Sequence, residues 1–430
     1  PGTSIAWVHR EAEADYARIQ AELEALVDDS LRALTGPGDA VWEANAGPLP
    51  VAGGAAMVVT ASGSRPGGVT AETDGDGIVL TGEYARLVVG PEGTITSLVD
   101  LATGREAVAE GSALGVAQVF RDIPNQWDAW DIDADYRLSG VTLSDVDQLE
   151  VVRDGVGSPE VLVRRSFGSS TLTQRIALAG DRAAVVIRTD VDWHERQRLL
   201  KLGFGLDVHA ERATSEIQFG HVHRPIHANT SWDAARFETP AQRWVHVGEA
   251  GYGFAVVNDA MHGHDIARTT RAGGGTTTTV RQSLLRAPLF PDPEADQGQH
   301  SFTTVLRLGA TIADAVEEGY RLFVPPRRVR GGAGVAPLVA IDGGGAIVEA
   351  VKLAEDGSGD VVVRLYESLG GRAHPTLTLD PLLDAASAVR TDLHEDPAQD
   401  PTERLTVDGR RIGLELRPFE IVTLRIPRLG

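Results

Sequence analysis

The sequence has 430 residues, 42% of them hydrophobic and 23% charged, which is an ordinary globular composition and is long enough for about three domains. Its formal net charge of −21 disfavours nucleic-acid binding, because an acidic surface repels phosphate backbones, and is consistent with neutral partners, sugars among them. The absence of cysteine excludes disulfides, thiol catalysis and zinc–thiolate sites, and no apolar run is long enough to span a membrane.

Residues 4–35 are predicted to form one long helix, with Ser4 as its cap and Gly36-Pro37-Gly38 as its end. Apolar residues recur along it at helical spacing and form a stripe: Ala12, Tyr16, Ile19, Leu23 and Leu26. No later amphipathic stretch is of comparable length. The stripe therefore either packs on a sheet or belongs to a bundle whose other helices are outside this chain, and we favour the second interpretation.

Most of the remaining sequence is predicted to form strands separated by short turns. The expected strands of the first half are residues 83–89, 94–99, 160–168, 171–178 and 183–193. Strands joined by turns, with few helices between them, predict antiparallel sheets of the β-sandwich class. A Pro- and Gly-rich stretch at 325–332 is typical of a linker, and the apolar runs after it, 347–356, 360–368 and 420–426, predict a small terminal sandwich.

Residues 121–136, RDIPNQWDAWDIDADY, combine two tryptophans with several aspartates. The spacing of the later aspartates is that of an EF-hand loop, but Tyr136 and Thr142 occupy its glycine and glutamate positions, which excludes an EF-hand although not another hard-cation site. A saccharide site explains the composition better, since sugar rings stack on indoles and their hydroxyls bind carboxylates. The alternative is a structural role for this stretch, in which the tryptophans pack into a domain interface and the aspartates cap turns.

Two further stretches carry candidate residues. His221 and His223 would share one strand face and, with His227, are candidates for a metal site, although satisfied or exposed histidines are the interpretation that we favour. Three prolines between 288 and 293 predict an irregular loop. The polar residues of that loop either are functional or form surface ion pairs: Arg286, Asp292, Glu294, Asp296 and His300. Only two lysines, Lys201 and Lys352, are available for Schiff-base chemistry, and neither lies in a motif.

Together these stretches resemble the C-terminal half of glycoside hydrolase family 38, the α-mannosidases, and most closely its cytosolic and bacterial members. Six blocks follow one another in the family's order: residues 121–133, 224–238, 251–259, 283–300, 351–371 and 416–426. Pro1 to Ile5 is similar to the end of a family block in which a zinc-binding histidine comes just before Pro-Gly-Thr-Ser.

The resemblance implies a mainly β fold. Residues 80–325 would form a large antiparallel β-supersandwich of the galactose-mutarotase-like kind, and residues 341–430 a small C-terminal β-sandwich, with a linker at 326–340. Residues 1–36 would be the last helix of a three-helix bundle, and residues 37–79 a linker with short strands.

The resemblance also implies retaining hydrolysis of α-mannosides in oligosaccharides. The nucleophile and a zinc ion, or another divalent metal, belong in the family to an N-terminal barrel that this sequence does not contain. We therefore expect no catalytic residue, metal ligand or cofactor in this chain, and no activity from it alone. Its expected partners are the barrel, the helical bundle and mannoside oligosaccharides, with a homo-oligomer allowed and nucleic acid and membrane excluded. The resemblance implies a cytoplasmic location, and no signal peptide is visible.

In this family, loops of the β-region lean over the barrel's active site. The first candidates for substrate binding would then line the sugar pocket or seal the barrel against the β-domain: Trp127, Asp128, Trp130, Asp131 and Asp133. The second candidates are Arg286, Asp292 and Asp296. A stand-alone carbohydrate-binding or architectural β-module is the alternative class. A self-contained metal enzyme would depend on the three histidines of the 219–238 stretch.

Overall fold

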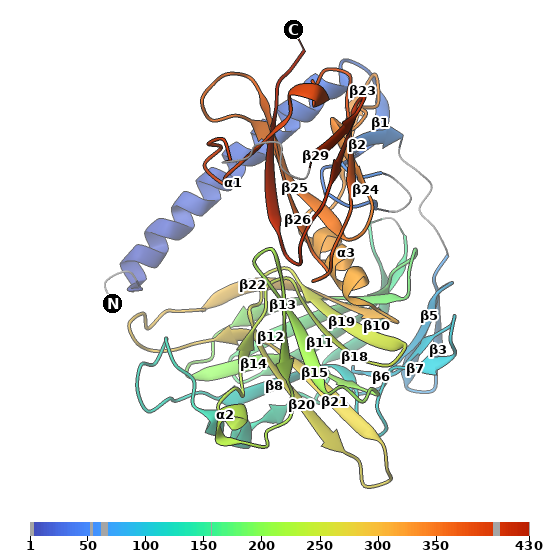
Figure 1. Ribbon diagram of the computed structural model, residues 1–430. Coiled ribbons are helices and arrows are strands. Elements are labelled where there is room, and N and C mark those ends of the chain that lie inside the picture. The colour runs from blue at the N-terminus through green and yellow to red at the C-terminus, as the bar shows by residue number, and fades with distance from the viewer. Residues whose placement is uncertain (1–3, 52–54, 62–67, 156, 399–404, 430) are drawn as a thin grey trace. The chain divides into compact units, whose positions relative to one another are not determined.

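The computed structural model describes residues 4–51, 55–61, 68–155, 157–398 and 405–429, and Figure 1 shows that they form a mainly β protein with one long N-terminal helix. The chain divides into two compact units. The larger unit comprises Pro1–Leu23, Arg65–Ser215 and His223–Glu318, and the smaller unit comprises Glu24–Ser64, Glu216–Val222 and Gly319–Gly430. Among the described residues, no helix combines the length and apolar character needed to cross a membrane.

Helix α1, Ala6–Thr35, confirms the long helix and its end, since Gly36 follows with a φ of +67°. The cap was predicted wrongly. The residue before the helix is Ile5, whose carbonyl accepts from the backbone N–H of His9 at 3.2 Å. The apolar stripe is exposed, with 41–70% of the surface of Tyr16, Ile19, Leu23 and Leu26 open to solvent. The start of the block Pro1–Ile5 lies outside the described residues.

We expect α1 to be the least protected element in amide hydrogen exchange. Isolated helices gain little from propensity alone, and most helical stability comes from a packed apolar face, which α1 does not have here. Strand β13 (Ala184–Trp193) is the internal standard, because it is paired on both sides. Exchange followed by mass spectrometry should show α1 peptides exchanging much faster than those of β13. Equal protection in a chain shown to be monomeric by light scattering would contradict this expectation.

The described residues form two large antiparallel sheets, most of whose strands belong to the larger unit. The nine-stranded sheet has the order β10 (Gln148–Arg153), β11 (Pro159–Phe167), β12 (Ser170–Leu178), β13, β22 (Gly298–Leu308), β19 (Tyr252–Asn258), β18 (Trp244–Glu249), β15 (Arg212–Ile217) and β16 (Gly220–Pro225). The eleven-stranded sheet has the order β17 (Thr239–Pro240), β20 (Gly263–Thr270), β21 (Thr276–Arg286), β14 (Arg198–Leu206), β8 (Leu114–Arg121), β6 (Ile95–Asp100), β5 (Ala85–Val89), β4 (Gly77–Thr81) and β3 (Thr70–Asp74), with β7 (Arg105–Glu106) on β6 and β9 (Val141–Thr142) on β8.

The two sheets share one apolar core, which makes the larger unit a sandwich. Leu87 of β5 and Leu172 of β12 belong to the same buried cluster, although they lie on different sheets. Strand β12 alternates buried and half-buried residues along its whole length, as a strand with one core face should. Strand β14 differs, because every residue from Leu199 to Leu206 is buried. Both faces of β14 are therefore covered, and this includes the face that carries Lys201.

The described residues of the smaller unit form three small sheets. One pairs β2 (Val58–Ala61), β1 (Ala40–Asn45) and β23 (Arg327–Gly331). The other two sheets share a core and form the predicted small sandwich: β24 (Val339–Asp342), β27 (Thr376–Leu379), β30 (Arg411–Leu414) and β29 (Leu405–Asp408) in one, and β25 (Ala346–Leu353), β26 (Val361–Glu367), β31 (Ile421–Ile426) and β28 (Val389–Thr391) in the other.

The segments interpreted as linkers contain regular structure. Residues 37–79 include β1, β2, β3 and the start of β4, and the 326–340 segment includes β23. Strand β1 pairs with β23 from Ala40 opposite Gly331 to Ala44 opposite Arg327. These partners are too far apart in the sequence for any local pattern to connect them.

Sequence reasoning missed the shorter helices. Helix α3, Ile312–Phe323, begins with a capping box in which the Thr311 hydroxyl and the Asp314 backbone N–H lie 3.2 Å apart and Asp314 Oδ2 accepts from Thr311 N at 2.7 Å. The Thr-x-x-Asp spacing was a signal that could have revealed it. Helix α2 (Ser231–Ala234) and the 3₁₀ turns η1 (Ala134–Ser139) and η2 (Ala385–Ser387) are single turns or little more.

Candidate functional site

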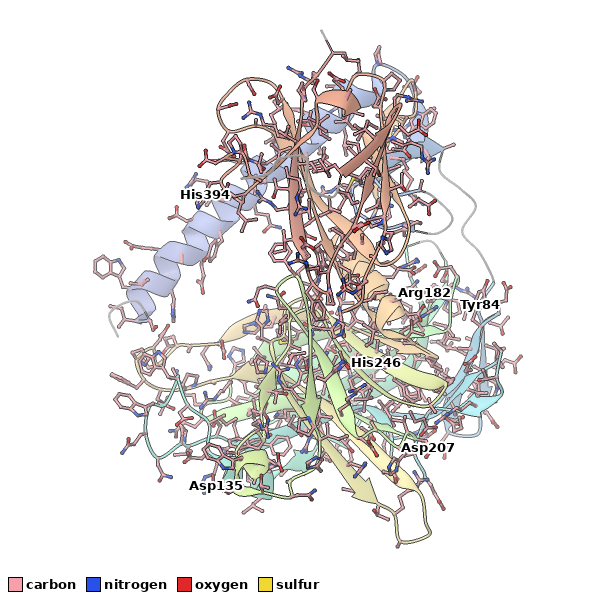
Figure 2. The ribbon with its side chains drawn as sticks, in the orientation of Figure 1. Tyr84, Asp135, Arg182, Asp207, His246 and His394 are labelled. Atoms are coloured by element: carbon pink, nitrogen blue, oxygen red, sulfur yellow. The ribbon has the colours of Figure 1, made fainter. Side chains whose placement is uncertain are left out.

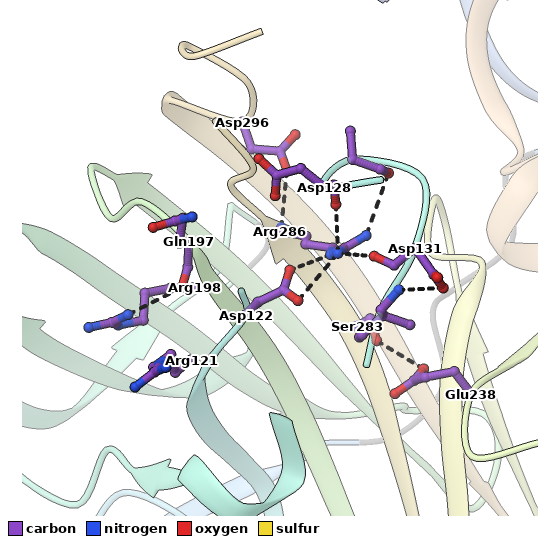
Figure 3. A network of polar contacts seen from close by, with 12 residues as sticks. Arg121, Asp122, Asp128, Asp131, Gln197, Arg198, Glu238, Ser283, Arg286 and Asp296 are labelled. Carbon is purple, nitrogen blue, oxygen red and sulfur yellow. Dashed lines mark hydrogen bonds and ion pairs between the residues drawn. The ribbon is translucent and has the colours of Figure 1, made fainter. Parts of the chain in front are cut away.

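Arg286, the last residue of β21, binds the residue that follows β8. Its guanidinium pairs with both carboxylate oxygens of Asp122, Nε with Oδ2 and Nη2 with Oδ1 at 3.2 Å (Figure 3). Asp122 is only 2% exposed, and burial raises its pKa although Arg286 lies against it. This two-pronged ion pair fixes the point at which the loop of residues 122–133, called here the 122–133 loop, leaves the sheet.

The same guanidinium holds the middle of the 122–133 loop. Nη2 donates to the carbonyl oxygens of Asp128, at 2.9 Å, and of Asp131, while the carbonyl of Ala129 lies 3.5 Å from Nη1 (Figure 3). The backbone N–H of Arg286 donates to Asp296 Oδ2 at 3.0 Å, and burial raises the pKa of that carboxyl group. Arg286 thus joins the 122–133 loop to the irregular 287–297 loop between β21 and β22.

The aspartates of the 122–133 loop bind backbone groups. Asp128 Oδ2 accepts from the N–H groups of Leu289 and Phe290, at 2.8 and 2.9 Å, and so links the two loops a second time. Asp133 Oδ2 accepts from the backbone and side-chain nitrogens of Asn125, both at 2.8 Å. The exposed Asp131 accepts through Oδ1 from Ile132 N at 2.9 Å. The side chain of Asp131 therefore has the most freedom to bind a ligand.

The two loops expose three large aromatic rings, called here the aromatic surface: Trp127, Trp130 and Phe290. They are 68%, 49% and 60% exposed. Trp130 and Phe290 meet edge to face with centroids 6.2 Å apart. Trp127 has a φ of +61°, in the left-handed region that is strained for a bulky residue, and its carbonyl accepts from Trp130 N at 2.6 Å. This tight turn carries the two exposed indole rings, those of Trp127 and Trp130.

The 287–297 loop also contacts the first helix. Asp292 is buried, and its Oδ1 accepts from Glu294 N at 2.9 Å while its Oδ2 lies 2.7 Å from Nδ1 of His9. His9 lies near the start of α1, within the larger unit. Asp292 therefore ties the beginning of α1 to the loops that carry the aromatic surface.

A buried ion cluster, called here the Lys201 cluster, lies beside the end of the 122–133 loop. Lys201 on β14 has no exposed surface, and its Nζ donates to Glu238 and, at 2.7 Å, to Asp265 Oδ2. The Tyr136 hydroxyl donates to Glu238 Oε1 at 2.5 Å, and Arg281 Nε donates to Asp265 Oδ1 at 2.9 Å. Burial raises the pKa of Tyr136. The cluster fixes η1, which begins directly after Asp133.

A small pocket lies between the 122–133 loop and η1. Its volume is about 230 Å³, and carboxylates at its wall include Asp122, Asp133 and Asp135. No group of three or more His, Cys, Asp or Glu side chains in the described parts of the chain is arranged to hold a metal ion. Of the three histidines considered for a metal site, His223 has its Nδ1 2.8 Å from the Thr214 hydroxyl, and His227 lies 3.6 Å from Asp233.

Two family models match the chain. The model of the glycosyl hydrolases family 38 C-terminal domain matches residues 80–294, and that of the family 38 C-terminal beta sandwich domain matches residues 345–424. The first match alone covers half of the sequence.

Known proteins with similar sequences are α-mannosidases. The chain is 36% identical over 373 residues to human alpha-mannosidase 2C1, a match that covers 84% of this chain and 34% of the human protein. It is 30% identical over 377 residues to alpha-mannosidase G of Dictyostelium discoideum, covering 82% and 33%. The chain thus spans about a third of the length of these relatives. An alpha-mannosidase from Enterococcus faecalis V583 shares the fold, with a TM-score of 0.66 at 16% identity, covering 86% of this chain and 45% of that one.

Proposed function

The chain belongs to glycoside hydrolase family 38, and we propose that it is the C-terminal β-region of a retaining α-mannosidase that hydrolyses α-mannosides in oligosaccharides. In this proposal the 122–133 and 287–297 loops complete the sugar pocket of an N-terminal barrel. The observation that carries it is the aromatic surface beside the exposed Asp131, on two loops that Arg286 locks together. A cytoplasmic location remains a prediction from the family resemblance.

The chemistry of these side chains suits a sugar ring. Indole faces stack on the C–H faces of a pyranose, and Trp127 and Trp130 are 68% and 49% exposed. Asp131 has an exposed carboxylate that accepts hydrogen bonds from sugar hydroxyls, and such bonds to a charged group strengthen as positive charge develops on the ring. Because Arg286, Asp128 and Asp133 already fix the loop backbone, ligand binding would need little further ordering.

The contact between His9 and Asp292 supports a position near the barrel's active site. The family block that Pro1 to Ile5 resembles has its zinc-binding histidine about seven residues before Ala6, and an extended chain of that length reaches at most ~25 Å. His9 is tied to the 287–297 loop at 2.7 Å. The two loops would therefore lie within reach of the metal and its bound sugar.

Zinc and the two reacting carboxylates are assigned in this proposal to the N-terminal barrel. The described residues of this chain offer no cluster of ligands that fits a zinc ion. Zinc would hold sugar hydroxyls there as a Lewis acid. The residues of this chain would bind and orient the sugar and exclude water from one side of the pocket, which lowers the activation barrier by positioning.

Asp131→Asn in the full-length enzyme tests the proposal. Loss of one charged hydrogen bond to the sugar is expected to lower kcat/KM on an aryl α-mannoside about ten- to a hundred-fold. The melting temperature should change little, because Asn keeps the shape and, among the described residues, the Asp131 side chain binds only the N–H of its neighbour, Ile132. The measurement is kcat/KM of the variant and of the unaltered enzyme, together with a thermal melt of each.

The matched control is Asp76→Asn, which removes an exposed carboxylate from the turn between β3 and β4. It should leave kcat/KM and the melt unchanged. If Asp131→Asn also leaves the efficiency unchanged in a normally melting enzyme, Asp131 does not contact the sugar. Tight binding of mannose oligosaccharides by the 430-residue chain alone, unaffected by its partner domains, would favour a carbohydrate-binding module instead.

A further inference from the structure

A groove with several basic side chains opens in the larger unit, and neither the family resemblance nor the proposed function uses it. Its volume is about 700 Å³, and a second groove of about 420 Å³ shares three of its lining residues, Glu211, Arg212 and His223. His209 and His246 also line the first groove, and Arg268 the second. Figure 2 labels His246, which lies on β18. We call the two together the Arg212 groove.

Arg212 and Arg268 have no carboxylate partner among the described residues. Arg268 uses Nη1 alone, which donates to His209 Nε2 at 3.3 Å and to the Ala210 carbonyl at 3.1 Å. Its Nε and Nη2 have no hydrogen-bond partner among the described residues. Arg105 nearby is different, because it pairs with Glu249 at 2.7 Å. Because Arg105 pairs with Glu249, the groove carries two guanidiniums without a carboxylate partner against one unpaired carboxylate, that of Glu211. In a protein with a formal net charge of −21, this local excess of positive charge favours an anionic ligand.

Other groups at the groove accept rather than donate hydrogen bonds. Glu211 has an exposed carboxylate with no hydrogen bond or ion pair within the described residues. His246 donates through Nε2 to the carbonyl of Ala310 at 2.8 Å, and burial lowers its pKa, so its Nδ1 carries a lone pair at neutral pH. A ligand that fits both sets of groups carries hydroxyls as well as negative charge.

The volume excludes a bare ion as the whole ligand. Small-molecule pockets hold roughly 300–1,000 Å³, whereas one water occupies about 30 Å³, so an inorganic phosphate would leave most of the Arg212 groove empty. A hexose carrying a phosphate is of the right size. Its phosphate oxygens suit the forked donors of arginine, which bind phosphate in a bidentate manner.

We propose that the Arg212 groove binds a phosphorylated monosaccharide, with Arg212 and Arg268 on the phosphate and Glu211 and His246 on the sugar hydroxyls. The site lies within the larger unit and uses none of the residues assigned to the sugar pocket. The inference therefore stands independently of the proposed α-mannosidase function. It gives the protein a second sugar site, one that responds to phosphorylated rather than neutral sugar.

Isothermal titration calorimetry of the 430-residue chain tests the site with three probes: mannose 6-phosphate, inorganic phosphate and mannose. Saturable binding of mannose 6-phosphate is expected, with weaker binding of phosphate and none of mannose at the same concentration. Arg212→Gln and Arg268→Gln are each expected to weaken mannose 6-phosphate binding about tenfold or more, since each removes a charged hydrogen-bond donor. Glu211→Gln should weaken mannose 6-phosphate but not phosphate.

Arg411→Gln on β30 is the control, because it removes one exposed positive charge from the C-terminal sandwich and should leave all three affinities unchanged. Equal affinity for phosphate and mannose 6-phosphate would overturn the sugar part of the proposal. Absence of saturation by both anions, or binding that neither arginine variant weakens, would overturn it entirely. If an arginine variant does not fold, the affinities of the unaltered chain for the three probes still test the proposal. Capture of an acidic peptide in place of mannose 6-phosphate would also contradict it.

Discussion

Lys201→Met is expected to destabilise the larger unit by about 3–5 kcal/mol, because removal of one partner from a buried ion pair leaves the other charges uncompensated. Lys201 has no exposed surface, and Asp265, which it contacts at 2.7 Å, is 3% exposed at its side chain. Methionine fills nearly the same volume, so the loss is electrostatic rather than a loss of packing. The measurement is a thermal melt of the chain together with hydrogen exchange in β14.

The control for this prediction is Lys352→Met, which removes the only other lysine in the sequence. Lys352 pairs with the exposed Glu355 and with Glu395 in the C-terminal sandwich, and 34% of its side chain is exposed, so solvent screens its charge more than that of Lys201. Glu395 is 7% exposed at its side chain but still accepts from Glu355 N at 2.8 Å, so the melt should change much less than in Lys201→Met. A second change gives an independent check. Glu238→Gln added to Lys201→Met removes one uncompensated charge and should restore part of the lost stability. Similar melts for the two lysine variants would show that the Lys201 cluster is not a source of stability.

The strands of the large sandwich could be predicted from the sequence because their signals are local. The strands predicted at 160–168, 171–178 and 183–193 are β11, β12 and β13 within one residue at each end, since a short turn separates each strand from the next. The β1–β23 pair could not be predicted in this way. Its partners lie some 290 residues apart, and Arg327 and Arg328 resemble linker residues more than strand residues. Only the tertiary fold brings them together.

The sequence predicts which residue types make up the candidate site, but it does not predict which of these residues bind one another. Trp127, Trp130 and Arg286 were singled out as residue types that suit a sugar site, and two of the three belong to the aromatic surface. Nothing in the sequence indicates that Arg286 pairs with Asp122, which lies in the 121–136 stretch but is not among the predicted site residues. Lys201 did carry a signal, because a lysine inside the apolar run LLKLGFGL requires buried partners. The identity of those partners depends on strand register and not on spacing.

Arg286→Lys in the full-length enzyme is expected to lower the proposed α-mannosidase kcat/KM about a hundred-fold with only a small change in the thermal melt. Lysine keeps a positive charge near the buried Asp122, so the ion pair is retained in part. It cannot reproduce the planar fork that reaches Asp122 and the carbonyls of Asp128 and Asp131 together (Figure 3). A shift of about 1 Å in a positioning loop is enough for an effect of this size.

Arg198→Lys is the matched control, since Arg198 begins the neighbouring strand β14 and, within the described part of the chain, its side chain donates to one carbonyl, that of Gln197 at 3.2 Å (Figure 3). It should leave kcat/KM unchanged. Limited proteolysis of the 122–133 loop separates positioning from sugar binding, because Arg286→Lys should make this loop easier to cleave whatever its role. A loop that is cleaved faster in an enzyme of unchanged efficiency would show that Arg286 positions a loop that the sugar does not contact. A slower enzyme whose loop is equally resistant would show instead that Arg286 acts on the sugar directly.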